Sequence, residues 1–82
     1  MNHEELFLNV KNYIINELLY GDDSQLTENT SFYNSGIINS MGIIGIVTYI
    51  QNLGVDISDE EIVPNNFDTL ASIKTYLSRK AH

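Results

Sequence analysis

The sequence contains no cysteine, only one proline and very few basic residues. Without cysteine the chain has no disulfide, no thiolate nucleophile and no cysteine-based metal site. Its two histidines, His3 and His82, stand at opposite ends of the chain, which argues against a zinc site built from both of them. We therefore expect neither a metal centre nor catalysis by a cysteine.

The charge balance is one-sided, with 4 Lys and Arg against 11 Asp and Glu and a net charge of −7. Binding to nucleic acid or to an anionic membrane needs clustered positive charge, which these few scattered residues do not supply. We therefore expect no nucleic-acid partner and no membrane partner. An acidic surface instead favours encounter with basic surfaces of other proteins.

Long hydrophobic runs are also missing. The longest, residues 41–50, is half of the roughly 20 residues that a membrane span needs. The chain does not begin with a basic segment followed by an apolar one, so we expect no signal peptide and a cytoplasmic location. With 82 residues, 43% of them hydrophobic, the chain is predicted to form a single domain over residues 1–82 and to act as a monomer.

Apolar residues recur at helical spacing in three segments. The first spans residues 4–19, the second spans residues 40–53 and the third begins near Asp68 and Thr69, either of which can cap it. Ser40 stands at the start of the second helix, where a hydroxyl can cap exposed backbone N–H groups. Gly54 follows the last apolar residue of that helix, as is typical of a helix C-terminus.

The connections complete the expected fold. Residues 21–39 form a long connection rich in turn-forming residues, and long connections of this kind are often functional. Ser58 and Glu61 have the spacing of a capping box, and Pro64 is expected to end the helix that it starts after about one turn. No strand pattern of useful length is present. The sequence predicts an all-α fold, a small four-helix bundle with three main helices and one short one.

One region departs from the acidic background, because no charged residue occurs from Asn29 through Val55. Inside it, Gly42 and Gly45 interrupt the second helix, at a cost of about 1 kcal/mol each relative to alanine. The simpler interpretation is that another helix packs closely against them. The functional interpretation is that Gly42, which has no side chain, leaves the Ser40 hydroxyl sterically accessible. Gly45 would in the same way allow a neighbour to approach one face of the helix closely. Residue type alone leaves both interpretations open.

Residues 27–77 resemble the phosphopantetheine-dependent acyl and peptidyl carrier proteins. The family's attachment motif, Asp-Ser-Leu or Asp-Ser-Met after a long loop, is matched by Asn39-Ser40-Met41. The segment 30–36, with its aromatic residues and glycine, is similar to the family's loop. Segments 53–57 and 59–69 look most like free-standing carriers of amino acids or short acyl groups, which work with a separate adenylating ligase.

The resemblance implies a four-helix bundle of the acyl carrier type that performs no catalysis itself. A phosphopantetheinyl transferase would attach 4'-phosphopantetheine from coenzyme A to Ser40. An adenylating acyl or aminoacyl ligase would then load a thioester onto the arm. Downstream tailoring or condensing enzymes of secondary-metabolite or peptide biosynthesis would receive the cargo. The serine has to lie exposed at a helix start, where the phosphate meets unpaired N–H groups.

The sequence departs from the family pattern at two positions, Asn39 for the usual aspartate and Gly45 for a frequent glutamate. The missing carboxylate at residue 39 is expected to slow modification or to require a dedicated transferase. The expected partner surface combines neutral contacts on the second helix with acidic groups after it. Its residues are Asn39, Met41, Ile44, Gly45, Glu60 and Glu61.

Several alternatives remain at this point. Within the same class, the chain could be a D-alanyl or fatty-acyl carrier. In a different class, it could be a helical adaptor that binds a partner without modification of Ser40. A serine hydrolase is disfavoured because no histidine lies in the middle of the chain to act as base. Glu60 and Glu61 could form a catalytic carboxylate pair, but their place in a capping box favours solvated surface charge.

Overall fold

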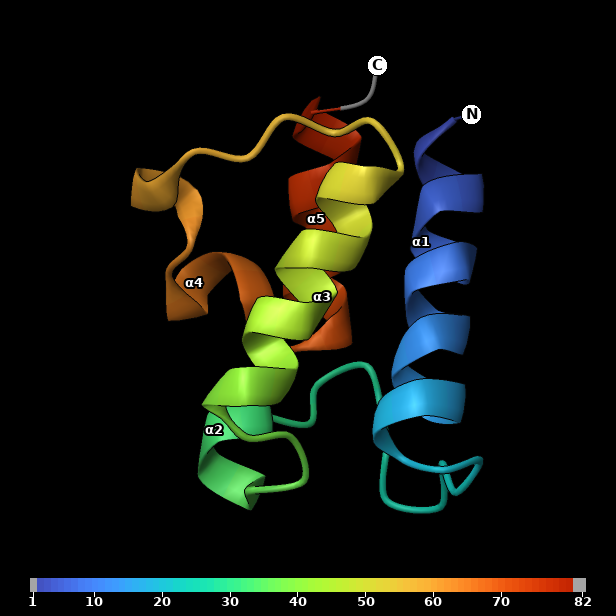
Figure 1. Ribbon diagram of the computed structural model, residues 1–82. Helices are drawn as coiled ribbons and strands as arrows, with labels where there is room; N and C mark the ends of the chain where they lie inside the picture. Colours follow the sequence, from blue (N-terminus) through green and yellow to red (C-terminus); the bar gives the residue numbers. More distant parts are fainter. Residues whose placement is uncertain (1, 81–82) are drawn as a thin grey trace.

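The computed structural model describes residues 2–80, and within them the chain is helical with no β-strand. Three long helices dominate: α1 (His3–Tyr13), α3 (Ser40–Asn52) and α5 (Leu70–Lys80). α1 runs antiparallel to α3 and α5 and contacts both of them (Figure 1). The predicted all-α helical bundle is therefore confirmed at this level.

Short helices fill the connections, and here the structure differs from the expected single short helix. The long first connection contains the four-residue helix α2 (Phe32–Ser35). The second contains a 3-10 turn, η2 (Asp59–Glu61), followed by α4 (Pro64–Phe67). Pro64 does not simply end a helix, because it occupies the first turn of α4, where its missing N–H costs nothing.

The helix boundaries follow local capping chemistry. Asn2 caps α1 by accepting a hydrogen bond from the Glu5 N–H, at 2.9 Å. Glu61 accepts hydrogen bonds from the backbone N–H and hydroxyl of Ser58, so the predicted capping box is present. Thr69 accepts from the Ser72 N–H at 2.9 Å and thus caps α5 as expected. These satisfied N–H groups are the reason that the sequence specifies these helix starts.

α1 continues without a break into η1 (Ile14–Leu18), a π-helical turn. In it, the Leu19 N–H bonds to the Ile14 carbonyl five residues earlier, at 3.0 Å. The chain then reverses at Tyr20 and Gly21, which both have positive φ angles of 54° and 85°. A wide turn followed by a left-handed tyrosine is an unusual way to end a helix, and it lies next to the start of α3.

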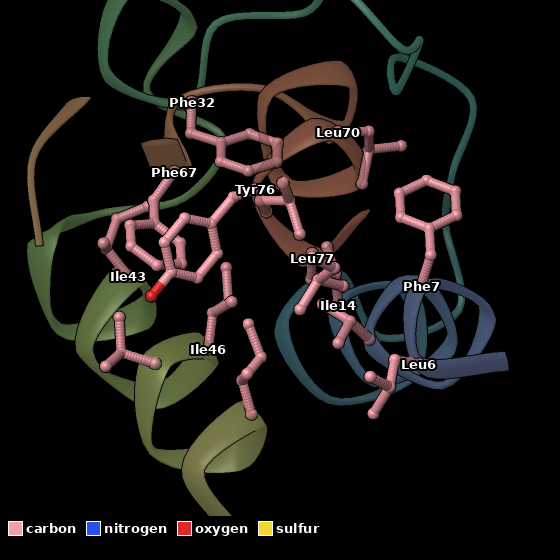
Figure 2. Close-up of a cluster of buried hydrophobic side chains, with 14 of the residues drawn as sticks. Leu6, Phe7, Ile14, Phe32, Ile43, Ile46, Phe67, Leu70, Tyr76 and Leu77 are labelled. Carbon is pink, nitrogen blue, oxygen red and sulfur yellow. The ribbon is translucent and has the colours of Figure 1, made fainter. Parts of the chain in front are cut away.

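One hydrophobic cluster joins the three long helices (Figure 2). No polar or charged residue among those described is buried in it. Phe32 of α2 and Phe67 of α4 enter it from the connections, so the short helices fasten both connections to the core (Figure 2). Its fully enclosed side chains include Val10, Ile14, Phe32, Ile46, Ile50, Phe67, Ile73 and Leu77.

Two structural findings bear on the function classes. No helix within residues 2–80 combines the length and the apolar character needed to cross a lipid bilayer. Over the same residues, no group of three or more His, Asp and Glu side chains is arranged to hold a metal ion. His82 lies outside the described residues.

Candidate functional site

The start of α3 is fixed by the segment that precedes it. The Asp68 carboxylate accepts hydrogen bonds from the Ser31 hydroxyl at 2.7 Å and from the Tyr33 N–H at 3.0 Å. The Asp68 carbonyl accepts a third from the Phe32 N–H at 2.7 Å. These bonds tie α2 to the beginning of α5. Gly36, at a φ of 73°, then ends α2 in the left-handed conformation that glycine adopts without strain. These contacts hold in place the segment that leads into α3, so α3 begins at a defined position, at the bottom of the bundle in Figure 1.

Asn39, and not Ser40, is the N-cap of α3. The Asn39 side-chain oxygen accepts a hydrogen bond from the Gly42 N–H at 2.9 Å. Ser40 is the first residue within the helix, so the expected capping role of its hydroxyl is wrong. Asparagine and serine are both common N-cap residues, so the sequence alone did not show which of Asn39 and Ser40 caps α3. Asn39 has the extended backbone of an N-cap, and Ser40 is already within the helix.

The Ser40 side chain is exposed, and its hydroxyl has no hydrogen-bond partner within residues 2–80. The backbone N–H groups of Ser40 and Met41 also have no partner there, because Asn39 engages the next two, those of Gly42 and Ile43. An exposed hydroxyl thus stands beside two free N–H donors at the positive end of a 13-residue helix. This arrangement is chemically suited to holding a phosphate ester.

Two apolar side chains of α3 near Ser40 are exposed. Met41 and Ile44 leave 73% and 56% of their surface exposed, the largest values among the aliphatic residues of α3. The predicted contact residues Met41 and Ile44 are therefore accessible, and Asn39 is exposed beside them.

Gly45 faces α1. A methyl group added at Gly45 would lie 2.8 Å from the Tyr13 hydroxyl oxygen. The Tyr13 ring in turn stacks on Tyr49, with ring centroids 4.4 Å apart. Close packing within the protein thus accounts for Gly45. Close packing also accounts for Gly42, because a methyl group added there would lie 2.6 Å from the Ile38 side chain.

The two acidic residues of the predicted surface have different surroundings. Glu60 is exposed, whereas Glu61 bonds to Ser58 and forms an ion pair with Lys80 at 3.1 Å. The hydrogen bond from the Ser58 backbone, followed by the Lys80 ammonium, lowers the pKa of Glu61 to about 2. Glu61 therefore serves local structure, and Glu60 is the freer of the two for contact with another protein.

A cleft of about 320 Å³ separates α1 and η1 from the start of α3. Residues from three parts of the chain line it, among them Tyr13, Glu17, Tyr20, Asn39, Met41 and Gly45. No motif or periodicity in the sequence singles out Glu17 or Tyr20. The only local hint was the pair of glycines in the second helix, which predicts a close neighbour without saying which residues supply it.

A comparison with models of known protein families gave no match, and a comparison with curated proteins gave none either.

Proposed function

We propose that the protein is a carrier that holds an aminoacyl or short acyl group as a thioester on a 4'-phosphopantetheine arm attached to Ser40. The observation that carries the proposal is the exposed Ser40 hydroxyl, without a hydrogen-bond partner within residues 2–80, at the start of α3. The resemblance of Asn39-Ser40-Met41 and its flanking segments to the carrier family supplies the chemistry. The all-α bundle with a long first connection is compatible with it.

The residues present fit the prosthetic group. Attachment would form a bond between Ser40 Oγ and the phosphorus of phosphopantetheine and break the pyrophosphate bond of coenzyme A. Adenosine 3',5'-bisphosphate would leave, and the hydroxyl proton would pass to a base of the transferase. The free N–H groups of Ser40 and Met41 could then donate hydrogen bonds to the phosphate oxygens. The arm, when attached, supplies a thiol, which this cysteine-free chain lacks.

The remaining surface would guide partner enzymes. Met41 and Ile44 offer exposed apolar contacts next to Ser40, and methionine adapts well to varied surfaces. Glu60 and other acidic groups outside α3 would steer basic partner surfaces. The proposed partners are a phosphopantetheinyl transferase, an adenylating ligase and the enzymes that accept the cargo. Tethering would raise the local concentration of the cargo at each docked enzyme.

The test is incubation with coenzyme A and a broad-range transferase, followed by intact-mass measurement. Wild type should gain the mass of one phosphopantetheine, and Ser40→Ala should gain none. Thr48→Ala is the matched control, since it removes another exposed hydroxyl from the same helix and should still be modified. If a known carrier is modified while the wild type is not, the proposal is rejected. Partner binding that survives Ser40→Ala would then support the adaptor alternative.

Asn39 offers a second test. Aspartate would accept the same hydrogen bond from the Gly42 N–H, so Asn39→Asp adds a charge without removing the cap. We expect Asn39→Asp to be modified faster than wild type, because the family's aspartate normally meets a basic group of the transferase. A rate no faster than wild type would show that the asparagine does not limit modification.

A further inference from the structure

The cleft between α1, η1 and the start of α3 lies beside the proposed attachment residue. Ser40 does not line it, but Asn39 and Met41, its neighbours on either side, both do. An arm on Ser40 therefore starts next to the rim of the cleft. A volume of about 320 Å³ is at the small end of ligand pockets, which run from roughly 300 to 1,000 Å³.

Among the lining residues that belong to the described part of the chain, Glu17 carries the only charged side chain. Tyr13 and Tyr20 add two phenol groups. Within residues 2–80 the Glu17 carboxylate has no ion pair and no hydrogen bond. The opposite wall, from Ile37 to Gly45, has no charge at all. An ionised carboxylate accepts hydrogen bonds only, so the ligand group that complements this cleft is a cation with N–H donors.

The backbone around Glu17 is a second, independent sign of a functional site. Glu17 belongs to the π-helical turn η1, and such turns are frequent at functional sites. Tyr20 follows at a φ of 54°, a conformation that is unfavourable for a bulky residue, and 91% of its surface is exposed. Burial of the Tyr20 ring therefore does not offset its strained backbone. The π-helical turn contributes Glu17 to the lining of the cleft, and the left-handed residue after it contributes Tyr20.

We propose that this cleft receives the ammonium group of an aminoacyl cargo carried on Ser40, with the Glu17 carboxylate as its counter-ion. The inference rests on the proposed carrier function and narrows the cargo from acyl groups in general to aminoacyl groups. The Tyr13 hydroxyl and the Asn39 amide add neutral polar groups around the ammonium. A fatty-acyl chain carries no N–H donor and no positive charge for the exposed Glu17 carboxylate.

The test compares two cargoes of nearly equal shape. Ser40 is loaded with alanyl-aminopantetheine, a stable amide analogue of the thioester, or with propionyl-aminopantetheine, which lacks the amine. Loading is verified by intact mass, and backbone amide shifts are measured by NMR. We expect the alanyl form, relative to the propionyl form, to shift the amide signals of Gly42, Gly45 and Tyr20. Glu17→Gln should abolish this difference, whereas Glu28→Gln, which removes an exposed carboxylate outside the cleft, should preserve it.

A pH titration of the alanyl methyl signal gives an independent readout. Pairing with Glu17 favours the charged amine, so the amine pKa should be higher in wild type than in Glu17→Gln, by up to about 1. Equal amide shifts for both cargoes, or equal amine pKa values in both proteins, would overturn the inference. A loaded protein with no shift in the cleft would also overturn it and leave the carrier function intact. Failure of loading itself would instead overturn the proposed function.

Discussion

The central helix α3 and the C-terminal end of α5 are stabilised by different interactions. α3 contains no charged residue and is held by buried isoleucines and by the close approach of Gly45 to Tyr13. The end of α5 carries Arg79 and Lys80, which bond to Asn66 at 3.0 Å and Glu61 at 3.1 Å. The stability of the first region depends on apolar area and shape, whereas that of the second also depends on ionisation. The exposed serine is in the region without charged residues.

The largest expected effect tests whether burial determines how much a residue of α3 contributes to the free energy of unfolding. Ile46 is fully buried and Ile44 is 56% exposed, although both are on the same helix. Ile46→Ala should lower the free energy of unfolding by about 2–5 kcal/mol, because it removes buried methyl groups and leaves a cavity. Ile44→Ala should change it by less than about 0.5 kcal/mol. Urea denaturation measures both, and similar losses for the two variants would contradict the division of α3 into a core face and a free face.

The second effect tests the contact between Gly45 and Tyr13. Alanine is favoured over glycine in a helix by about 1 kcal/mol, but a methyl at residue 45 would crowd the Tyr13 hydroxyl, 2.8 Å away. In Tyr13→Phe the nearest remaining Tyr13 atom, Cζ, lies 4.0 Å away, an ordinary contact. We therefore expect Gly45→Ala to stabilise the Tyr13→Phe protein by about 1 kcal/mol and the wild type by clearly less. Additive effects in this double-mutant cycle would show that the hydroxyl does not constrain residue 45.

A third and smaller effect concerns Tyr76 of α5. Its side chain lies among the buried side chains of the core (Figure 2). It is 2% exposed, and its hydroxyl has no hydrogen-bond partner within residues 2–80. Burial, with the Glu61 carboxylate as a second cause, raises the pKa of Tyr76 to about 12. Because an unpaired buried hydroxyl is unfavourable, Tyr76→Phe should increase the free energy of unfolding by up to about 1 kcal/mol. Tyr33→Phe, at an exposed site, should leave it unchanged. A clear loss in Tyr76→Phe would mean that the hydroxyl has a partner in solution.

The smallest effect is the pH dependence at the end of α5. The pKa of Glu61 is about 2 in the folded protein, against an ordinary value of 4.5. A lowered pKa stabilises the folded state above pH 4.5, and this contribution is lost as the pH falls toward 2. Glu61→Gln should therefore reduce the dependence of stability on pH between these values. Glu60→Gln keeps the contacts of Glu61 with Ser58 and Lys80 and should retain the wild-type dependence. Indistinguishable pH profiles for wild type and Glu61→Gln would contradict this assignment.

Local chemistry made much of the fold predictable from the sequence. The capping box at Ser58 and the cap at Thr69 are present where expected, and Gly54 has the positive φ angle of a glycine after a helix. α2 was missed because four residues are too few to show a helical period. The helix before Pro64 is one turn long, as predicted, but the second role of Pro64, in the first turn of α4, was not predicted.

The candidate site was predictable only on its α3 side. Ser40, Met41 and Ile44 belong to one continuous segment, and their exposure follows from the helical period of that segment. Glu17 and Tyr20 reach the same place through long-range packing of α1 against α3. A π-helical turn has no distinct residue pattern, so residues 14–18 could not be recognised as a departure from the regular helical period.

The π-helical turn has a consequence for how this protein can change in length. Because η1 accommodates one residue more than an α-helical turn, deleting a single residue from it would restore α-helical geometry and leave the following side chains facing nearly the same way. Deleting a residue from the regular helix α1 would instead rotate the side chains on one side of the deletion by about 100° relative to those on the other. A one-residue deletion is therefore expected to be tolerated better in η1 than within α1.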